Sequence, residues 1–288
     1  MYVTSSGTSG KFSQIGFDWG CVLAEVPMVL HLGWRHGLIS PKPAHCVILG
    51  YKPHKSNQTG VTRTMYGLTY FSPPISRTYA LHYADGEYVP DLDGIARALD
   101  RLGRSFFPTR IVGFPSYLWF GLKRMEELGL RVTLPRGSKI LLAGGWKQHY
   151  SQQVEKPVLY DLAQRILGIP ESQIHEFFGA VEHPIFYNAC RRHHFHIPIY
   201  SRVIIRDVNT LEPLPMGRVG LVNLISPLMN ATPTTSVMTD DLGYLTPGED
   251  CGCGISSPYL TILGRVGLSD IQTCAAGAAQ LLGKGEGF

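Results

Sequence analysis

The sequence predicts an α/β protein, and three observations support that class. Short β-rich runs alternate with segments of helical periodicity up to about residue 200. Beyond that point, strands and turns replace the alternation. The 288 residues are 44% hydrophobic and 17% charged, which is enough for a sizeable core. We expect an α/β core over residues 1–200, a β-rich subdomain over 201–263 and a short C-terminal segment with a helix over 264–288.

Helical signals occur in five segments. The first, Asp18–Leu32, is strongly apolar, and Pro27 is expected to kink it. Two more, Asp93–Leu102 and Ser116–Gly129, begin at residues expected to cap them and carry apolar side chains at helical spacing. The second of these ends at a glycine, a common helix terminator. The remaining two helices are expected over Pro157–Leu167 and Gln272–Leu282.

Strand signals fall into two groups. The expected strands of the first part are Cys46–Gly50, Arg110–Gly113, Lys139–Ala143 and His175–Phe178. Because helices separate them, we expect these strands to pair in parallel, with a ligand site in the loops at their carboxyl ends. The expected strands of the second part are Val203–Arg206, Val219–Leu224, Thr234–Met238 and Tyr259–Leu263, the first two in a hairpin-like arrangement.

Composition excludes several classes of protein. The net charge of +4 is spread along the chain, so it favours anionic ligands only weakly and does not indicate a nucleic-acid partner. The most apolar stretch, Ile111–Leu122, contains Gly113 and Pro115, so no membrane span is expected. No signal peptide is recognisable, which favours the cytoplasm. Six cysteines are too sparse for a disulfide scaffold.

Residues 4–11 form a loop-like motif, Thr-Ser-Ser-Gly-Thr-Ser-Gly-Lys, that suits phosphate binding. Glycines let backbone N–H groups approach an anion, while hydroxyls add donors and the lysine adds charge. The motif is not a Walker A loop, because Ser5 replaces its first glycine and Phe12 replaces its magnesium-binding hydroxyl. A flexible N-terminal tail is the alternative interpretation.

Three further motifs suit a nucleotide. Gly144-Gly145 follows a buried strand and could admit a flat ligand close to the backbone, although a simple glycine turn fits as well. Asp241, in a segment expected to follow a strand, could accept hydrogen bonds from ribose hydroxyls, or lie in a solvated turn. Glu182 could offer an oxygen to a phosphate-bound Mg²⁺, or be an exposed loop carboxylate.

The cysteines suggest two kinds of chemistry. Cys251 and Cys253 are one residue apart, and Cys190 lies close to three histidines. With His196 as preferred fourth ligand and His194 as the alternate, they predict a structural Cys₃His zinc site; free buried thiols are the alternative. Cys274 lies near the start of the last expected helix, where a helix N-terminus stabilises a thiolate nucleophile, but a buried structural cysteine also fits.

Taken in order, these motifs resemble the acyl-protein synthetases (long-chain-fatty-acid–luciferin-component ligases) of the adenylate-forming ligase superfamily, from Thr4 to about Leu282. The anchors are residues 4–10, Gly144-Gly145-Trp146-Lys147, Asp207 through Gly220, Thr239-Asp240-Asp241, and Gly264-Arg265-Val266 through Cys274. The Cys/His set is similar to that of the phenylacetate–CoA ligases. The resemblance implies an adenylate-forming ligase core of mixed sheets layered with helices, followed by a β-rich subdomain.

The resemblance also implies a function and a set of roles. ATP and a carboxylic acid give an acyl-adenylate, and a thiol then takes the acyl group. The implied nucleotide and magnesium site comprises Ser5, Ser6, Gly7, Thr8, Ser9, Gly10, Lys11, Gly144, Gly145, Phe178, Gly179, Glu182, Asp241 and Arg265. The implied acyl-accepting residue is Cys274, and the onward acceptor is CoA, a carrier protein or a partner reductase. Homo- and hetero-oligomers both remain open.

Two departures keep alternatives open. The family carries a long segment before its glycine loop and this chain has almost none, so we expect the N-terminal part of the family fold to be absent. Val181 replaces a threonine that donates to phosphate in the wider superfamily. A CoA or carrier-protein ligase with a structural Cys274, or a non-catalytic subunit with a degenerate site, are therefore the rival interpretations.

Overall fold

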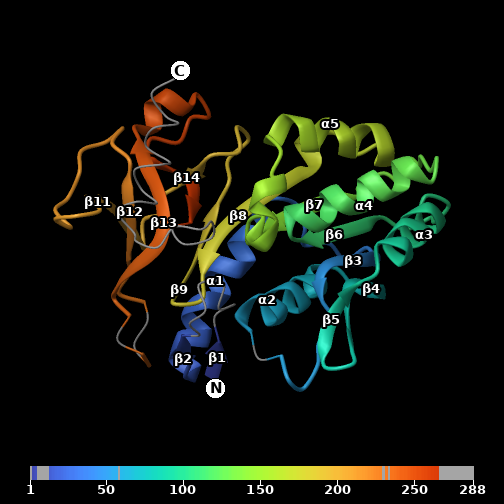
Figure 1. Ribbon diagram of the computed structural model, residues 1–288, viewed down its shortest axis with the longest axis horizontal. Coiled ribbons are helices and arrows are strands. Elements are labelled where there is room, and N and C mark those ends of the chain that lie inside the picture. Colours follow the sequence, from blue (N-terminus) through green and yellow to red (C-terminus); the bar gives the residue numbers. More distant parts are fainter. Residues whose placement is uncertain (1, 5–12, 58, 229–230, 233, 266–288) are drawn as a thin grey trace. The chain divides into compact units, whose positions relative to one another are not determined.

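The computed structural model describes residues 2–4, 13–57, 59–228, 231–232 and 234–265 (Figure 1). The chain divides into two compact units: unit 1 comprises residues 1–28 and 178–288, and unit 2 comprises residues 29–177. This division differs from the expected boundary after residue 200, because the N-terminal strands pack with the half of the chain that begins at residue 178. The expected helix over 272–282 lies outside the described residues.

Unit 2 is built on a mostly parallel sheet. Its strands are β3 (Ala44–Tyr51), β4 (Pro74–Ala84), β5 (Glu87–Pro90), β6 (Thr109–Gly113), β7 (Lys139–Ala143) and β8 (Ile174–Ala180). They are ordered β5-β4-β3-β6-β7-β8, and every neighbouring pair is parallel except the β4–β5 hairpin. The predicted parallel pairing is therefore confirmed. Strands β3 and β6 are almost wholly buried, as expected for central strands covered on both faces.

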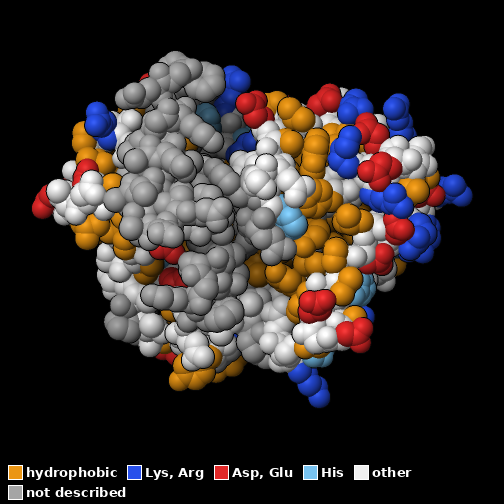
Figure 2. Space-filling model, viewed as in Figure 1, with side chains coloured by type: hydrophobic (Ala, Val, Ile, Leu, Met, Phe, Trp, Pro, Cys, Tyr) orange, Lys and Arg blue, Asp and Glu red, His pale blue; other side chains and the backbone are white. Residues whose placement is uncertain are grey.

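Helices connect the strands of unit 2. They are α2 (Gly60–Leu68), α3 (Leu92–Leu102), α4 (Pro115–Glu127) and α5 (Lys156–Leu167), with short 3₁₀ turns η1 (Thr69–Phe71), η2 (Lys147–Gln152) and η3 (Glu171–Gln173). Over α3, α4 and α5, basic and acidic side chains are interspersed on the face that Figure 2 shows. Ion pairs between these helices include Arg124 Nε–Asp93 Oδ1 at 2.6 Å.

Two predicted helix caps are wrong. Asp91 caps α3, since its Oδ1 accepts from the Gly94 N–H at 2.7 Å, while Asp93 lies in the first turn. In α4, Ser116 is buried inside the helix, and the helix begins with Pro115 without a side-chain cap. Proline at the first helical position needs no N–H partner and already has a helical φ, so it starts the helix without a capping side chain.

Unit 1 combines an N-terminal β-ribbon with an antiparallel sheet. The ribbon pairs β1 (Tyr2–Thr4) with β2 (Gln14–Gly16), and α1 (Trp19–Arg35), which contains Pro27, leads into unit 2. Strand β9 (His183–Asn188) follows β8 at the sheet edge. The five-stranded sheet has the order β10 (Phe195–His196), β14 (Tyr259–Arg265), β13 (Ser236–Thr246), β12 (Gly220–Ile225) and β11 (Arg202–Arg206), and η4 (Gly248–Cys251) lies between β13 and β14.

Candidate functional site

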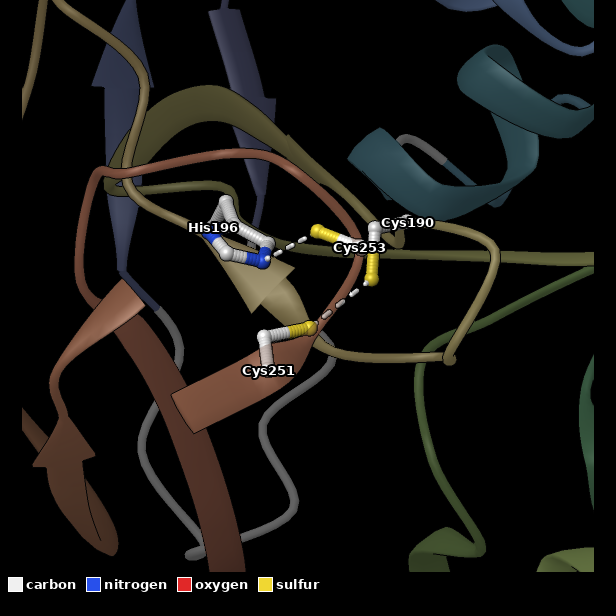
Figure 3. Close-up of side chains that lie close together, drawn as sticks. All are labelled: Cys190, His196, Cys251 and Cys253. Carbon is white, nitrogen blue, oxygen red and sulfur yellow. Dashed lines mark hydrogen bonds between the residues drawn. The ribbon is translucent and has the colours of Figure 1, made fainter. Parts of the chain in front are cut away.

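Four predicted metal ligands converge in unit 1. The Sγ atoms of the three cysteines and one ring nitrogen of His196 all lie within 4.8 Å of one another. Figure 3 shows the side chains of Cys190, His196, Cys251 and Cys253 gathered around one point. The Cys190 and Cys251 sulfurs are 3.5 Å apart, and Cys253 Sγ lies 3.3 Å from His196 Nε2. Residues some sixty positions apart in the sequence therefore form one cluster, as predicted.

Local backbone structure explains this convergence. His196 lies in β10, which pairs with Tyr259 of β14, so the end of β9 is brought against the segment that precedes β14. Gly252 and Gly254 have φ of +67° and +90°. A side chain is strained at these angles, so Gly252 allows the chain to turn between the two cysteines and Gly254 allows it to turn directly after the second.

The surrounding hydrogen bonds prepare the cluster for a cation. The Nδ1–H of His196 donates to the Ser257 carbonyl at 2.6 Å, which leaves Nε2 with its lone pair toward the sulfurs. Backbone N–H groups of Arg192 and Ile255 donate to Cys190 and Cys253 at 3.3 and 3.4 Å. N–H donors placed in this way suit sulfur ligands of a bound cation.

The donor set fits a tetrahedral divalent ion. Typical zinc–sulfur and zinc–nitrogen bonds place neighbouring ligand atoms about 3.5–3.8 Å apart, close to the separations observed here. Three ligands are buried, as in closed structural sites. Burial raises the pKa of the Cys251 thiol to about 12. A bound cation reverses that penalty by stabilising the thiolate.

The predicted phosphate loop and Cys274 lie outside the described residues, which applies to Ser5, Ser6, Gly7, Thr8, Ser9, Gly10, Lys11 and Cys274. The two ends of the loop are described. Thr4 pairs with Gln14, and the buried Val3 and Ile15 anchor the ribbon. Val181 packs against the same cluster, so the turn that carries Glu182 lies close to the ribbon.

Asp241 lies inside a strand, which corrects the prediction of a loop after one. Strand β13 runs to Thr246, and Asp241 is 7% exposed. Between the pairs Asn223↔Met238 and Leu221↔Leu242, β13 has three residues where β12 has only Val222. The aspartate therefore lies on a β-bulge, a feature that often redirects a side chain beside an active site.

The other predicted nucleotide-binding residues belong to separate units. Gly144 and Gly145 follow β7 in unit 2, are exposed and have φ of +79° and +64°. In unit 1, Phe178 is half-buried against Tyr187, with ring centroids 5.7 Å apart, and Gly179 is exposed. The backbone of Arg265 pairs with Asp241.

The sequence prediction missed the residues that support the predicted metal ligands. Two of the donors to sulfur, Arg192 and Ile255, lie two positions after one of the clustered cysteines. That spacing is a usable sequence signal. Ser257, which orients His196 through its carbonyl, carries no such signal because its role depends on the backbone alone.

A model of the family described as acyl-protein synthetase, LuxE, matches residues 1–283. The chain belongs to this family. The resemblance inferred from the motifs is thereby confirmed.

Two curated relatives are long-chain-fatty-acid–luciferin-component ligases. The Vibrio harveyi relative is 25% identical over 194 residues, covering 66% of this chain and 50% of the relative. The Aliivibrio fischeri relative is 23% identical over 158 residues, covering 54% and 41%. The chain thus spans about half the length of the curated relatives that it matches, or less.

Solved structures share the fold of this LuxE-family chain. A 2-hydroxyisobutyryl-CoA ligase in complex with 2-HIB-AMP has a TM-score of 0.64 at 16% identity, over 92% of this chain and 52% of that chain. ATP-bound MatB from Rhodopseudomonas palustris has a TM-score of 0.54 at 16% identity, over 92% and 47%. These identities establish the fold alone, and they confirm the expected α/β architecture of adenylate-forming ligases. Among the described residues, no helix is long and apolar enough to span a membrane.

Proposed function

We propose that this chain activates a carboxylic acid with ATP and passes the acyl group to a thiol. The observation that carries the proposal is the match to the acyl-protein synthetase family over residues 1–283, on a fold shared with adenylate-forming ligases. In the first step, the acid's carboxylate oxygen bonds to the α-phosphorus of ATP and pyrophosphate leaves. In the second, a thiolate sulfur bonds to the acyl carbon and AMP leaves.

The proposed roles follow the family's motifs. Residues 5–11 hold the β- and γ-phosphates, Gly144 and Gly145 lie beside the adenine, and Asp241 accepts from the ribose. Glu182 would hold a Mg²⁺ ion, which would offset the charge on the leaving pyrophosphate. The phosphate assignment is supported by the β1–β2 ribbon, which anchors both ends of the loop. The assignment of Glu182 is supported by its neighbour Val181, which packs against the same ribbon. Phe178 and Gly179 precede Glu182 on the way to the same turn, and Arg265 lies beside Asp241 in the sheet.

An exchange assay tests activation directly. We expect incorporation of labelled pyrophosphate into ATP that depends on the added acid, tested with long-chain fatty acids, which the relatives' names specify, and with shorter aliphatic and aromatic acids. Asp241→Asn should reduce exchange more than tenfold. Asp240→Asn, an exposed neighbour with the same chemistry, should leave it nearly unchanged. Folded protein that shows no exchange with any acid would refute the proposal.

A trapping experiment tests the acceptor. We propose that Cys274 takes the acyl group before an external thiol, such as CoA, a carrier protein or a partner reductase, receives it. Incubation with ATP and labelled acid should leave a hydroxylamine-labile label on the chain, which is lost in Cys274→Ala and kept in Cys46→Ala. Label-free protein that still consumes CoA would favour the CoA ligase alternative, in which Cys274 is structural.

We further propose that the Cys₃His cluster binds a structural Zn²⁺. The ion would tie the segment after β9 to the segment before β14, and thereby stabilise unit 1. Metal analysis of the purified chain should give about one equivalent of zinc. A stable chain that purifies without metal and takes up none would refute this assignment. Location in the cytoplasm stays a prediction from the sequence.

A further inference from the structure

His194 lies beside the metal cluster but outside the four-residue ligand set. We propose that it is a positioning residue of the metal centre, whose Nδ1–H donates to the Cys251 thiolate; this rests on the zinc site proposed above. The Nδ1 atom lies 3.1 Å from Cys251 Sγ. The four atoms that converge within 4.8 Å already complete a tetrahedral set without it.

Cys251 differs from the other two cysteines in the donor that reaches it. Cys190 and Cys253 each accept from a backbone N–H two residues further along the chain. Cys251 is reached by a side chain from the opposite segment, 57 residues away in the sequence. Three thiolates around a divalent ion carry a net negative charge, and each N–H donor offsets part of it. The bond from His194 therefore also links the two halves of the cluster.

His194 is held in place by two further contacts, one through its ring and one through its backbone. Its ring stacks on Tyr259 with centroids 4.2 Å apart and planes 4° from parallel. Its backbone carbonyl accepts from the Cys190 N–H at 2.9 Å. His194 thus bonds one ligand residue through its main chain and another through its side chain. A side chain held in this way is poised to donate in a fixed direction, which is what orients a ligand.

Cobalt substitution and chelator competition test this role. The test variants are His194→Ala, which removes the donor, and His194→Asn, whose amide nitrogen occupies nearly the same position as Nδ1. His193→Asn is the matched control: it removes the adjacent histidine at a position with φ of +59°, which asparagine tolerates. All variants are purified as the full chain, and each is loaded with Co²⁺ or Zn²⁺ alone.

We expect every variant to bind one metal ion with the sulfur-to-cobalt charge-transfer absorption of a three-thiolate site. Zinc loss to a chelator should be about 10–100-fold faster in His194→Ala than in the unaltered chain. In His194→Asn, the rate of zinc loss should lie within a few-fold of the rate for the unaltered chain. In His193→Asn, the rate should equal that of the unaltered chain. A purely structural effect on folding would not be rescued by asparagine alone.

Three results would overturn the inference. Equal zinc loss from His194→Ala and the unaltered chain would show that the hydrogen bond has no role. Loss of the tetrahedral cobalt spectrum in His194→Ala, with retention in His196→Ala, would make His194 a ligand instead. An unaltered chain that binds no metal would remove the zinc site together with this role, whereas the first two outcomes leave the site standing.

Discussion

Acidification is expected to weaken unit 1 through His183, the residue that follows Glu182. His183 is fully buried, and its Nε2 lies 3.0 Å from the Tyr187 hydroxyl and 3.3 Å from Ser201 Oγ. Burial lowers its pKa from 6.5 to about 4. The folded state therefore holds this imidazole neutral at pH values where the unfolded chain already binds a proton.

The pKa difference sets both the sign and the size of the effect. Between about pH 6.5 and 4 the unfolded state binds more protons, so stability falls as the pH falls through this range. Above about pH 6.5 His183 is neutral in both the folded and the unfolded chain, so its contribution to the free energy of unfolding is fully present. The shift corresponds to about 3 kcal/mol lost between pH 7 and pH 4. A loss of that size is a large part of the stability of an ordinary domain.

Urea unfolding followed by far-UV circular dichroism at several pH values measures this loss. His183→Gln keeps a donor near Tyr187 but cannot titrate. Between pH 7 and 4, its free energy of unfolding should therefore fall by about 3 kcal/mol less than that of the unaltered chain. His31→Gln, at an exposed position of α1, is the control and should keep the slope of the unaltered chain. Equal slopes for His183→Gln and the unaltered chain would refute the reasoning.

Three further predictions concern the fold and the metal cluster. Asp91→Ala should lower the free energy of unfolding by about 1 kcal/mol because it removes the cap of α3, and Asp93→Ala should cost less than half as much; the reverse order in urea titrations would contradict the assignment of the cap. Gly243→Ala should destabilise the chain by about 1–3 kcal/mol, because a Cβ there would lie 2.4 Å from the Thr261 carbonyl oxygen; an unchanged melting temperature would count against this close approach. Cys253→Ser should lower both the zinc content and the melting temperature of the purified chain, and a chelator should lower the melting temperature of the unaltered chain but not of the variant.

Sequence patterns identified the elements whose signal is local. The apolar runs at 46–50, 110–113 and 139–143 are strands because each is buried on both faces of a parallel sheet. The pattern failed for β4, whose buried residues are confined to its middle and whose apolar Ile75 and Tyr83 are exposed toward its ends. Strand β9 was missed as well, since its alternation of buried and half-buried residues depends on other strands of unit 1 packing against it.

Capping residues and strand ends were less well predicted because neighbouring residues compete for the same role. Asp91 and Asp93 both have a side chain that can cap, and only the backbone position of Asp91 places its carboxylate at the Gly94 N–H. Likewise, Asp240-Asp241 before a glycine is typical of a turn. Pairing with β14 on one side and a bulge against β12 on the other keep this segment in the sheet.

The sequence by itself determined which residue types could do the chemistry: the soft ligands of a Cys₃His set, the order of the motifs and the family to which they belong. Tertiary structure alone decided that Cys190, His196, Cys251 and Cys253 lie within 4.8 Å of one another. The reason is that donor distances depend on the pairing of β10 with β14, a contact between residues some sixty positions apart. Local propensity holds no information about such pairings, because they form only when distant strands share one sheet.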